Sequence, residues 1–173
     1  FLKRLTDLTG YERAMPVNTG LEAVETALKA ARKWGHKVKG IAEDCAEIIA
    51  CNGNFHGRSI AITGLSSEPQ YRDGFGPFPP ALKRIPYGDA AALEAAITPN
   101  TAAFLVEPIQ GEGGIIIPPE GYLAACAEIC KRHNVLLIAD EIQSGLGRTG
   151  HLLATQHDRI RPDGVILGKT LGG

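Results

Sequence analysis

The sequence lacks any long hydrophobic run, and its apolar stretches fall far short of the roughly 20 residues that a bilayer-spanning helix needs. Its start, Phe1 to Arg4, lacks the pattern of a secretory signal peptide. Neither sign of charge dominates, because 18 Lys and Arg face 19 Asp and Glu and the formal net charge is −1. We therefore expect neither a membrane nor a nucleic acid as a partner.

Several common catalytic and nucleotide-binding motifs are missing too. The sequence contains no Gly-x-x-x-x-Gly-Lys-Ser/Thr phosphate loop and no Gly-x-Ser-x-Gly elbow. Residues 145–150 do match the Gly-x-Gly-x-x-Gly dinucleotide pattern, but residues 141–144 separate them from the preceding apolar run. Because of the match, a dinucleotide-binding dehydrogenase domain stays as an alternative from another functional class, although this separation from the strand weakens it.

Cysteine is sparse, and Cys45, Cys51, Cys126 and Cys130 lie in apolar or periodic segments. Such placement favours thiols in a protein core and a reducing compartment. We therefore expect a cytoplasmic protein, or one of the mitochondrial matrix if the source is a eukaryote. Cys126, Cys130 and His133 share helical spacing, yet no second ligand pair accompanies them, so we expect no metal site.

Short apolar runs alternate with helical patterns along the chain. The helical patterns cover residues 2–8, 21–34, 90–97 and 121–133. The apolar runs that predict strands cover residues 46–51, 84–87, 102–106, 135–140 and 165–167. This alternation predicts an α/β fold with a mostly parallel sheet flanked by helices, in one domain over residues 1–173. Residues 66–80 predict a long loop, functional or covered by a partner.

Two ionisable residues follow the last two predicted strands. Asp140 closes the first of these strands, and Lys169 follows the second after Gly168. Open α/β sheets bind ligands at the carboxyl ends of their strands. A lysine there can form a Schiff base with an aldehyde cofactor, while the aspartate keeps a pyridine nitrogen protonated so that the ring withdraws electrons. The structural alternative is an aspartate that caps a helix and a solvated lysine.

The helix predicted over residues 21–34 begins after two capping residues, Asn18 and Thr19, and Gly20 lets a ligand approach the backbone closely. Free N–H groups at this end suit a phosphate, although an ordinary helix cap has the same residues.

Further candidates follow two other strands. Phe55 offers a ring to stack on a planar cofactor, and the alternative is that it packs in the core. Arg58 offers a bidentate contact for a carboxylate, and the alternative is a solvated residue at a helix start. Glu112 lies among glycines, where a carboxylate can gate a site or be an ordinary turn acid.

These segments together resemble the class III pyridoxal-phosphate-dependent aminotransferases over nearly the whole chain. The motifs are Asn-Thr-Gly-Leu-Glu-Ala at 18–23, Ala-Arg-Lys-Trp at 31–34, Gly-Asn-Phe-His-Gly-Arg at 53–58, Asp-Gly-Phe-Gly-Pro at 73–77, Val-Glu-Pro-Ile-Gln-Gly-Glu at 106–112, Ala-Asp-Glu-Ile-Gln at 139–143 and Leu-Gly-Lys at 167–169. The resemblance implies the large domain of the fold-type I transferases, with pyridoxal 5'-phosphate as cofactor.

The resemblance also implies a role for each matching residue. The implied cofactor contacts are Lys169 as the Schiff-base lysine, Asp140 at the pyridine nitrogen, Gln143 at the phenolic oxygen, the backbone N–H groups of Gly20 and Leu21 at the phosphate, and Phe55 stacked on the ring. Toward the substrates, Arg58 would hold the α-carboxylate of the oxo-acid, and Glu112 would pair with an arginine beyond residue 173.

The implied reaction is a two-stage transfer. Ornithine gives its δ-amino group to the cofactor and leaves as glutamate semialdehyde, and 2-oxoglutarate takes the group to become glutamate, with Lys169 carrying the proton. Another class III donor, acetylornithine or 4-aminobutyrate, is the alternative, because Phe-His-Gly-Arg is shared with acetylornithine members and Gly113 replaces a frequent alanine. Thr19, Gly20 and residues 31–34 favour ornithine.

Compared with the family, this chain resembles an internal piece that lacks the N-terminal segment and the C-terminal small domain. Members build each active site from two subunits, so the resemblance implies a homodimer or higher homo-oligomer. The expected small-molecule partners are the amino acid and the oxo-acid, and we expect the 173-residue chain alone to turn over poorly or not at all.

Overall fold

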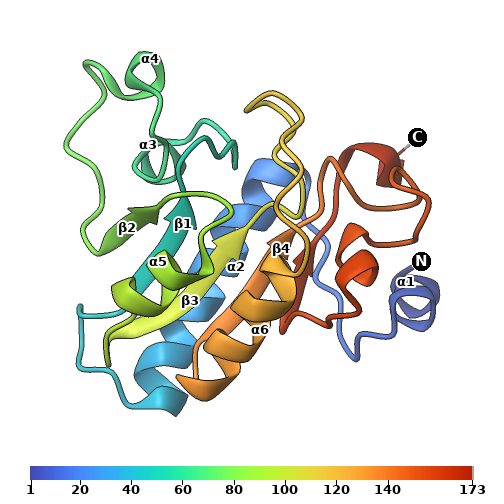
Figure 1. Cartoon of the computed structure of the whole chain (residues 1–173), viewed down its shortest axis with the longest axis horizontal. Helices are drawn as coiled ribbons and strands as arrows, with labels where there is room; N and C mark the ends of the chain where they lie inside the picture. The colour runs from blue at the N-terminus through green and yellow to red at the C-terminus, as the bar shows by residue number, and fades with distance from the viewer. Residues whose placement is uncertain (173) are drawn as a thin grey trace.

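The computed structural model describes residues 1–172 and contains a single parallel sheet of five strands (Figure 1). The strands are β1 (Glu47–Cys51), β2 (Leu82–Ile85), β3 (Thr101–Val106), β4 (Leu136–Asp140) and β5 (Gly164–Ile166). Their order across the sheet is β2-β1-β3-β4-β5. All four neighbouring pairs are parallel, which confirms the predicted fold class.

Helices cover both faces of this sheet. The longer ones are α1 (Leu2–Thr9), α2 (Gly20–Trp34), α5 (Ala90–Ala96) and α6 (Tyr122–Arg132). Short helical segments are η1 (Gly35–Lys39), α3 (Ile60–Thr63), α4 (Pro69–Arg72), η2 (Ala154–Asp158) and η3 (Lys169–Gly172). In Figure 1, α2 lies behind the sheet while α5 and α6 lie in front of it. The result is a three-layer arrangement with the sheet as the middle layer.

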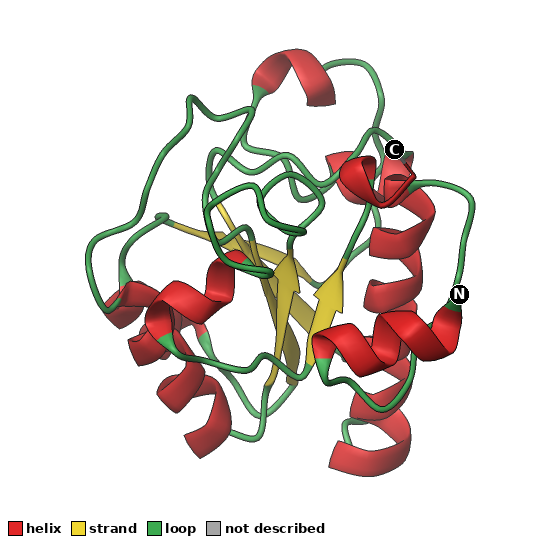
Figure 2. Ribbon diagram, turned by 90° about the vertical axis from the view of Figure 1, so that its right-hand side faces the viewer, coloured by secondary structure: helices red, strands yellow, loops and turns green. Residues whose placement is uncertain are grey.

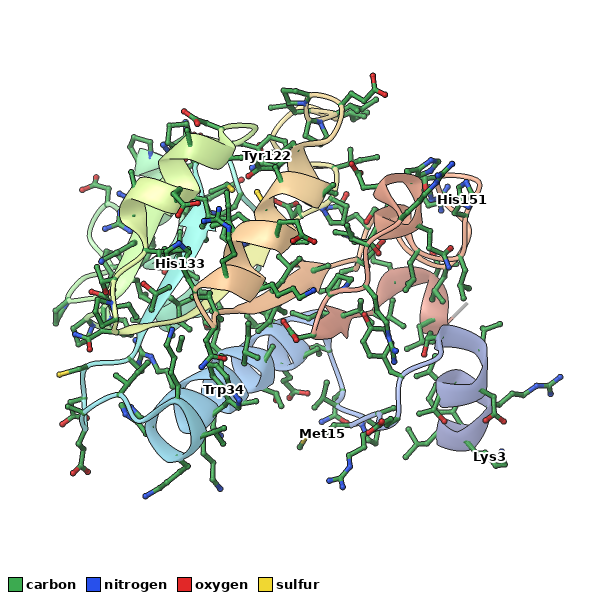
Figure 3. All side chains as sticks on the ribbon, turned by 60° about the horizontal axis from the view of Figure 1, so that its bottom comes forward. Lys3, Met15, Trp34, Tyr122, His133 and His151 are labelled. Atoms are coloured by element: carbon green, nitrogen blue, oxygen red, sulfur yellow. The ribbon has the colours of Figure 1, made fainter. Side chains whose placement is uncertain are left out.

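The apolar stripe of α2 decides which of its faces meets the sheet. Val24, Leu28 and Ala31 recur at helical spacing and are buried in one core cluster with residues of the strands. A second cluster, on the other face, contains Leu123 and Cys126 of α6. Figure 3 shows α2, with Trp34, and α6, with Tyr122 and His133, on opposite sides of the sheet.

The middle of the sheet is buried on both faces. Every residue of β3 is buried, and Phe104 is among the largest fully buried side chains. Burial on both sides explains why the strands appear in the sequence as continuous apolar runs rather than alternating ones.

The strand order reverses between β1 and β3, because the chain proceeds outward from β1 to β2 and then returns to the other side of β1. The loops that follow β1 and β3 therefore diverge at this point, where open α/β sheets bind ligands. Figure 2 shows loops and short helices gathered beyond the arrowheads of the strands. A ligand site is therefore expected at the rim formed by the carboxyl ends of the strands.

Some predicted boundaries were wrong. The strand predicted at 84–87 is β2, Leu82–Ile85, which pairs with β1 from Leu82 and ends before Pro86, a residue without an N–H for the ladder. The loop predicted at 66–80 contains α4, which begins at Pro69. Cys45 is exposed, although the other three cysteines lie in the core as predicted. No helix within residues 1–172 is both long enough and apolar enough to cross a membrane.

Candidate functional site

The side chain of Ile142, two residues after β4, joins three parts of the rim. A Cβ added to Gly20 would lie 2.9 Å from Cδ1 of Ile142, and one added to Gly168 would lie 3.2 Å from its Cγ2. The start of α2 and the segment after β5 therefore pack on the same side chain. A larger residue at either position would require the Ile142 side chain to shift, so glycine allows the closest approach.

The turn after β1 is brought to the same place. Gly57 has a φ of 129°, and a Cβ there would lie 2.5 Å from Cδ1 of Leu21 in α2. The Phe-His-Gly-Arg turn thus rests on the first turn of α2. Four segments that are far apart in the sequence, at Gly20, Gly57, Ile142 and Gly168, form one continuous rim.

The N-terminus of α2 has a complete capping box. The Thr19 hydroxyl accepts the N–H of Glu22 at 3.1 Å, and Glu22 Oε2 accepts the N–H of Thr19 at 3.2 Å. Within residues 1–172 no hydrogen bond takes the N–H of Gly20 or Leu21. These two groups, at the positive end of the helix dipole, are available to an anion.

A cavity of about 660 Å³ lies between α1, α2, the strand β5 and the segment that follows it. Thr19, Gly20, Gly168 and Lys169 are among its lining residues, so the predicted lysine and the predicted phosphate cradle share one cavity. Among the described residues, its lining does not include Asp140, Phe55 or Gln143. Those side chains lie on other parts of the rim.

Asp140 is buried at the end of β4 and is held from two sides. Its Oδ2 lies 2.7 Å from Nδ1 of His56, and its Oδ1 accepts the N–H of Ile142 at 3.1 Å. Since a carboxylate can only accept, Nδ1 of His56 carries the proton of this bond. Burial lowers the pKa of His56, but the hydrogen bond and the charge of Asp140 outweigh burial, and the net pKa is raised.

Glu107 is a second buried carboxylate, directly after β3. Its Oε2 accepts the N–H of Phe55 at 3.1 Å. Burial raises the pKa of Glu107 to about 7, with the charge of His56 acting in the opposite direction and that of Asp140 adding to the rise. Together, Asp140, His56 and Glu107 form a buried cluster of ionisable groups, which we call the acid–imidazole cluster.

The side chains predicted to meet the ring and the carboxylate are close to each other. The guanidinium carbon of Arg58 lies 5.6 Å from the centroid of the Phe55 ring. Tyr71, from α4, meets the same ring edge-on, with centroids 6.0 Å apart. Phe55 is thus oriented by its neighbours rather than buried in the core, which was the alternative from the sequence.

Gln143 and Glu112 also meet. Gln143 Nε2 donates to Glu112 Oε1 at 3.2 Å. The sequence resemblance gave Glu112 an arginine beyond residue 173 as its partner, whereas within the described residues its hydrogen-bond partner is Gln143. The Gln143 amide also packs on Gly111, where a Cβ would collide with it.

His56, Glu107 and Ile142 belong to the site, although they were not among the residues predicted from the sequence. Glu107 stands directly after a fully buried strand, which is the same signal that pointed to Asp140. His56 lies within the motif that carries Phe55 and Arg58. Ile142 has no signal of its own, because its contacts are with glycines far away in the sequence.

The glycine-rich segment 145–150 forms turns and does not open a helix, as a dinucleotide-binding fingerprint must. The residues that flank this segment are held by Glu141, a buried residue whose carboxylate accepts four hydrogen bonds. The donors are the Ser144 hydroxyl at 2.8 Å, the N–H groups of Ala154 and Thr155 at 2.9 Å each, and the Thr155 hydroxyl at 3.0 Å. The dinucleotide alternative therefore lacks its structural context.

The helical Cys126, Cys130 and His133 do not form a ligand set. Both thiols are buried in the core, and burial raises the pKa of each to about 12. His133 Nε2 instead pairs with Glu94 at 2.5 Å. Within residues 1–172 no three His, Cys, Asp or Glu side chains come together as a metal site.

We predict that Glu141→Gln lowers the free energy of unfolding by about 1–3 kcal/mol, because one amide oxygen cannot accept what two carboxylate oxygens accept and buried donors lose their partners. Urea unfolding measures this change. Glu128→Gln, the same substitution at an exposed position of α6, is the control and should change stability by less than about 0.5 kcal/mol. Equal effects of the two substitutions would contradict the prediction.

A second prediction concerns pH. Because the pKa of Glu107 rises from 4.5 to about 7 on folding, the folded state retains a proton that the unfolded state loses, so this group costs stability as pH rises from about 4.5 to about 7. Glu107→Gln removes this dependence. Unfolding free energies of both proteins across that range should therefore diverge in favour of the variant, and a constant difference would argue against a raised pKa.

The comparisons with known proteins agree with this geometry. The family described as aminotransferase class-III matches residues 1–173. The ornithine aminotransferase of Bacillus subtilis (strain 168) is 62% identical over 173 residues, which are 100% of this chain and 43% of that protein. The chain thus spans less than half the length of this relative.

Two solved structures are also similar. The ornithine aminotransferase of Toxoplasma gondii, whose structure reveals partial occupancy of PLP at the active site, superposes with a TM-score of 0.97 at 50% identity and covers 98% of this chain and 40% of its own. The acetylornithine aminotransferase of Elizabethkingia anophelis has a TM-score of 0.81 at 46% identity, with 98% and 38% covered. With a matched family over its whole length and the same parallel sheet, this chain belongs to the class III aminotransferases.

Proposed function

We propose that residues 1–173 are the cofactor-binding part of the large domain of an aminotransferase that moves the δ-amino group of ornithine to 2-oxoglutarate with pyridoxal 5'-phosphate. The observation that carries the proposal is the packing of Gly20 and Gly168 on Ile142. It brings the start of α2, at Gly20, and the lysine after β5 to one cavity, and β5 pairs with the strand that ends in Asp140.

The residues present fit this cofactor. The N–H groups of Gly20 and Leu21 would hold its phosphate, and the ring of Phe55 would stack on its ring. Asp140, fixed by His56 and by the N–H of Ile142, would meet the pyridine nitrogen. When bound, the cofactor supplies an electron-withdrawing ring that stabilises negative charge on the substrate carbon.

Three further side chains would contact the cofactor or the oxo-acid substrate. Lys169 would bond to the cofactor aldehyde through Nζ and, once released, carry a proton at that atom. Gln143, bonded to Glu112, would meet the phenolic oxygen of the cofactor. Arg58 would bind the α-carboxylate of the oxo-acid through its planar guanidinium.

Ornithine is the proposed donor because the Bacillus subtilis relative, named ornithine aminotransferase, is 62% identical over the whole of this chain. Acetylornithine is the alternative, since the acetylornithine aminotransferase of Elizabethkingia anophelis shares this fold. We also propose a homo-oligomer, because members of the family build their sites from two subunits. A cytoplasmic location is proposed because the placement of the cysteines favours a reducing compartment.

The first experiment is borohydride reduction of the 173-residue chain mixed with pyridoxal phosphate. We expect a yellow complex and, after reduction and peptide mapping, a label on Lys169, because an amine beside a phosphate cradle captures the aldehyde. Lys169→Ala should lose the label. Lys131→Ala, which removes an exposed lysine of α6, should retain it.

If the 173-residue chain stays colourless, the same test on a chain extended past Gly173 decides the matter. A longer chain that is also unlabelled at Lys169 would refute the proposal.

The donor is tested on that longer chain with 2-oxoglutarate as acceptor. We expect ornithine to be used about tenfold or more faster than acetylornithine or 4-aminobutyrate, since a site with polar partners for one amine leaves them unpaired with another donor. Formation of glutamate measures the rate with each donor. Faster turnover of acetylornithine would assign the chain to the alternative.

A further inference from the structure

Glu107 has no part in the proposed function, yet it is buried at the point where the strand order reverses. We propose that Glu107 is a positioning residue that fixes the Phe55 ring and, through its charge on His56, the Asp140 carboxylate. The inference rests on the proposed function, because the ring that Phe55 and Asp140 would contact is that of the cofactor.

A hydrogen bond of Glu107 joins two loops that diverge from neighbouring strands. Its carboxylate follows β3 and accepts the N–H of Phe55, which follows β1, at 3.1 Å. One buried side chain thus sets where the backbone of Phe55 lies relative to the β3 loop.

The backbone of Glu107 is itself held firmly. The Tyr87 hydroxyl lies 3.1 Å from the Glu107 carbonyl oxygen and 2.9 Å from that of Pro108. The two loops also touch directly, because Gln110 Nε2 donates to the Asn52 carbonyl at 2.8 Å. Glu107 therefore acts from a rigid base, and a loss of its carboxylate would free Phe55 rather than move β3.

The charge of Glu107 acts on the other half of the cluster. Glu107 and Asp140 both favour the protonated form of His56, whose Nε2 is buried and has no partner within the described residues. Cys51 and Tyr87 also face the cluster, and burial raises the pKa of both, so neither is charged near neutral pH. Among these neighbours, His56 is the group whose charged form the two carboxylates stabilise.

The test makes the same conservative substitution, glutamate to glutamine, at two buried carboxylates. Glu107→Gln offers one acceptor oxygen where the carboxylate has two, and Glu141→Gln makes the same change on a residue that faces the 144–155 segment instead. Amide hydrogen exchange, followed by NMR at about pH 8, reports on each bond. We expect exchange at Phe55 to quicken about tenfold in Glu107→Gln, while Ala154 and Thr155 stay protected.

In Glu141→Gln the pattern should reverse, with faster exchange at Ala154 and Thr155 and no change at Phe55. The His56 imidazole, titrated by NMR, should have a lower pKa in Glu107→Gln and an unchanged one in Glu141→Gln. Unaltered exchange at Phe55 together with an unaltered His56 titration in Glu107→Gln would overturn the inference. General loosening in both variants would overturn it too.

The cofactor arm separates this inference from the proposed function. Absorbance titration with pyridoxal phosphate should give a dissociation constant about three- to tenfold higher for Glu107→Gln than for the wild type, and an unchanged one for Glu141→Gln. If the wild type labels Lys169 but Glu107→Gln binds equally well, the positioning role is lost and the proposed function stands. If the wild type and a longer chain both fail to label Lys169, the proposed function is lost, and the role of Glu107 toward the ring falls with it.

Discussion

The contact of two glycines with the side chain of Ile142 is the constraint on which the site depends. Gly20 opens α2 and Gly168 follows β5, and each lies so close to Ile142 that a Cβ would crowd it. Close packing of this kind is unforgiving, because a core responds to a single added methyl group. The N-terminal N–H groups of a long helix and the lysine after an edge strand thereby reach one cavity, although about 150 residues separate them in the chain.

The acid–imidazole cluster shows how the same rim accommodates buried ionisable groups. Buried carboxylates are costly unless they are paired or hydrogen-bonded. Asp140 has His56 and a backbone N–H as partners, and Glu107 has the N–H of Phe55. Because His56 and Phe55 both come from the loop after β1, these contacts also determine how that loop lies across the switch point between β1 and β3.

Much of the architecture was predictable because local patterns agreed with the fold. The capping residue Thr19 and the apolar stripe of α2 predicted its start and its buried face correctly. The continuous apolar runs predicted a parallel sheet. The predicted position of β2 was wrong because the pairing of an edge strand with its neighbour β1, rather than its own composition, decides where it begins. Cys45 is exposed because it precedes β1 in a turn and does not join the strand.

By itself, the sequence determined which ionisable and aromatic residues follow the strands, since strand and helix periods depend on neighbours along the chain. Asp140, Phe55 and Lys169 could therefore be assigned to the rim. Only the tertiary structure decided their partners, such as His56 for Asp140 and Gln143 for Glu112. The reason is physical: contacts between distant segments follow from strand order and close packing, and neither is encoded in any local pattern.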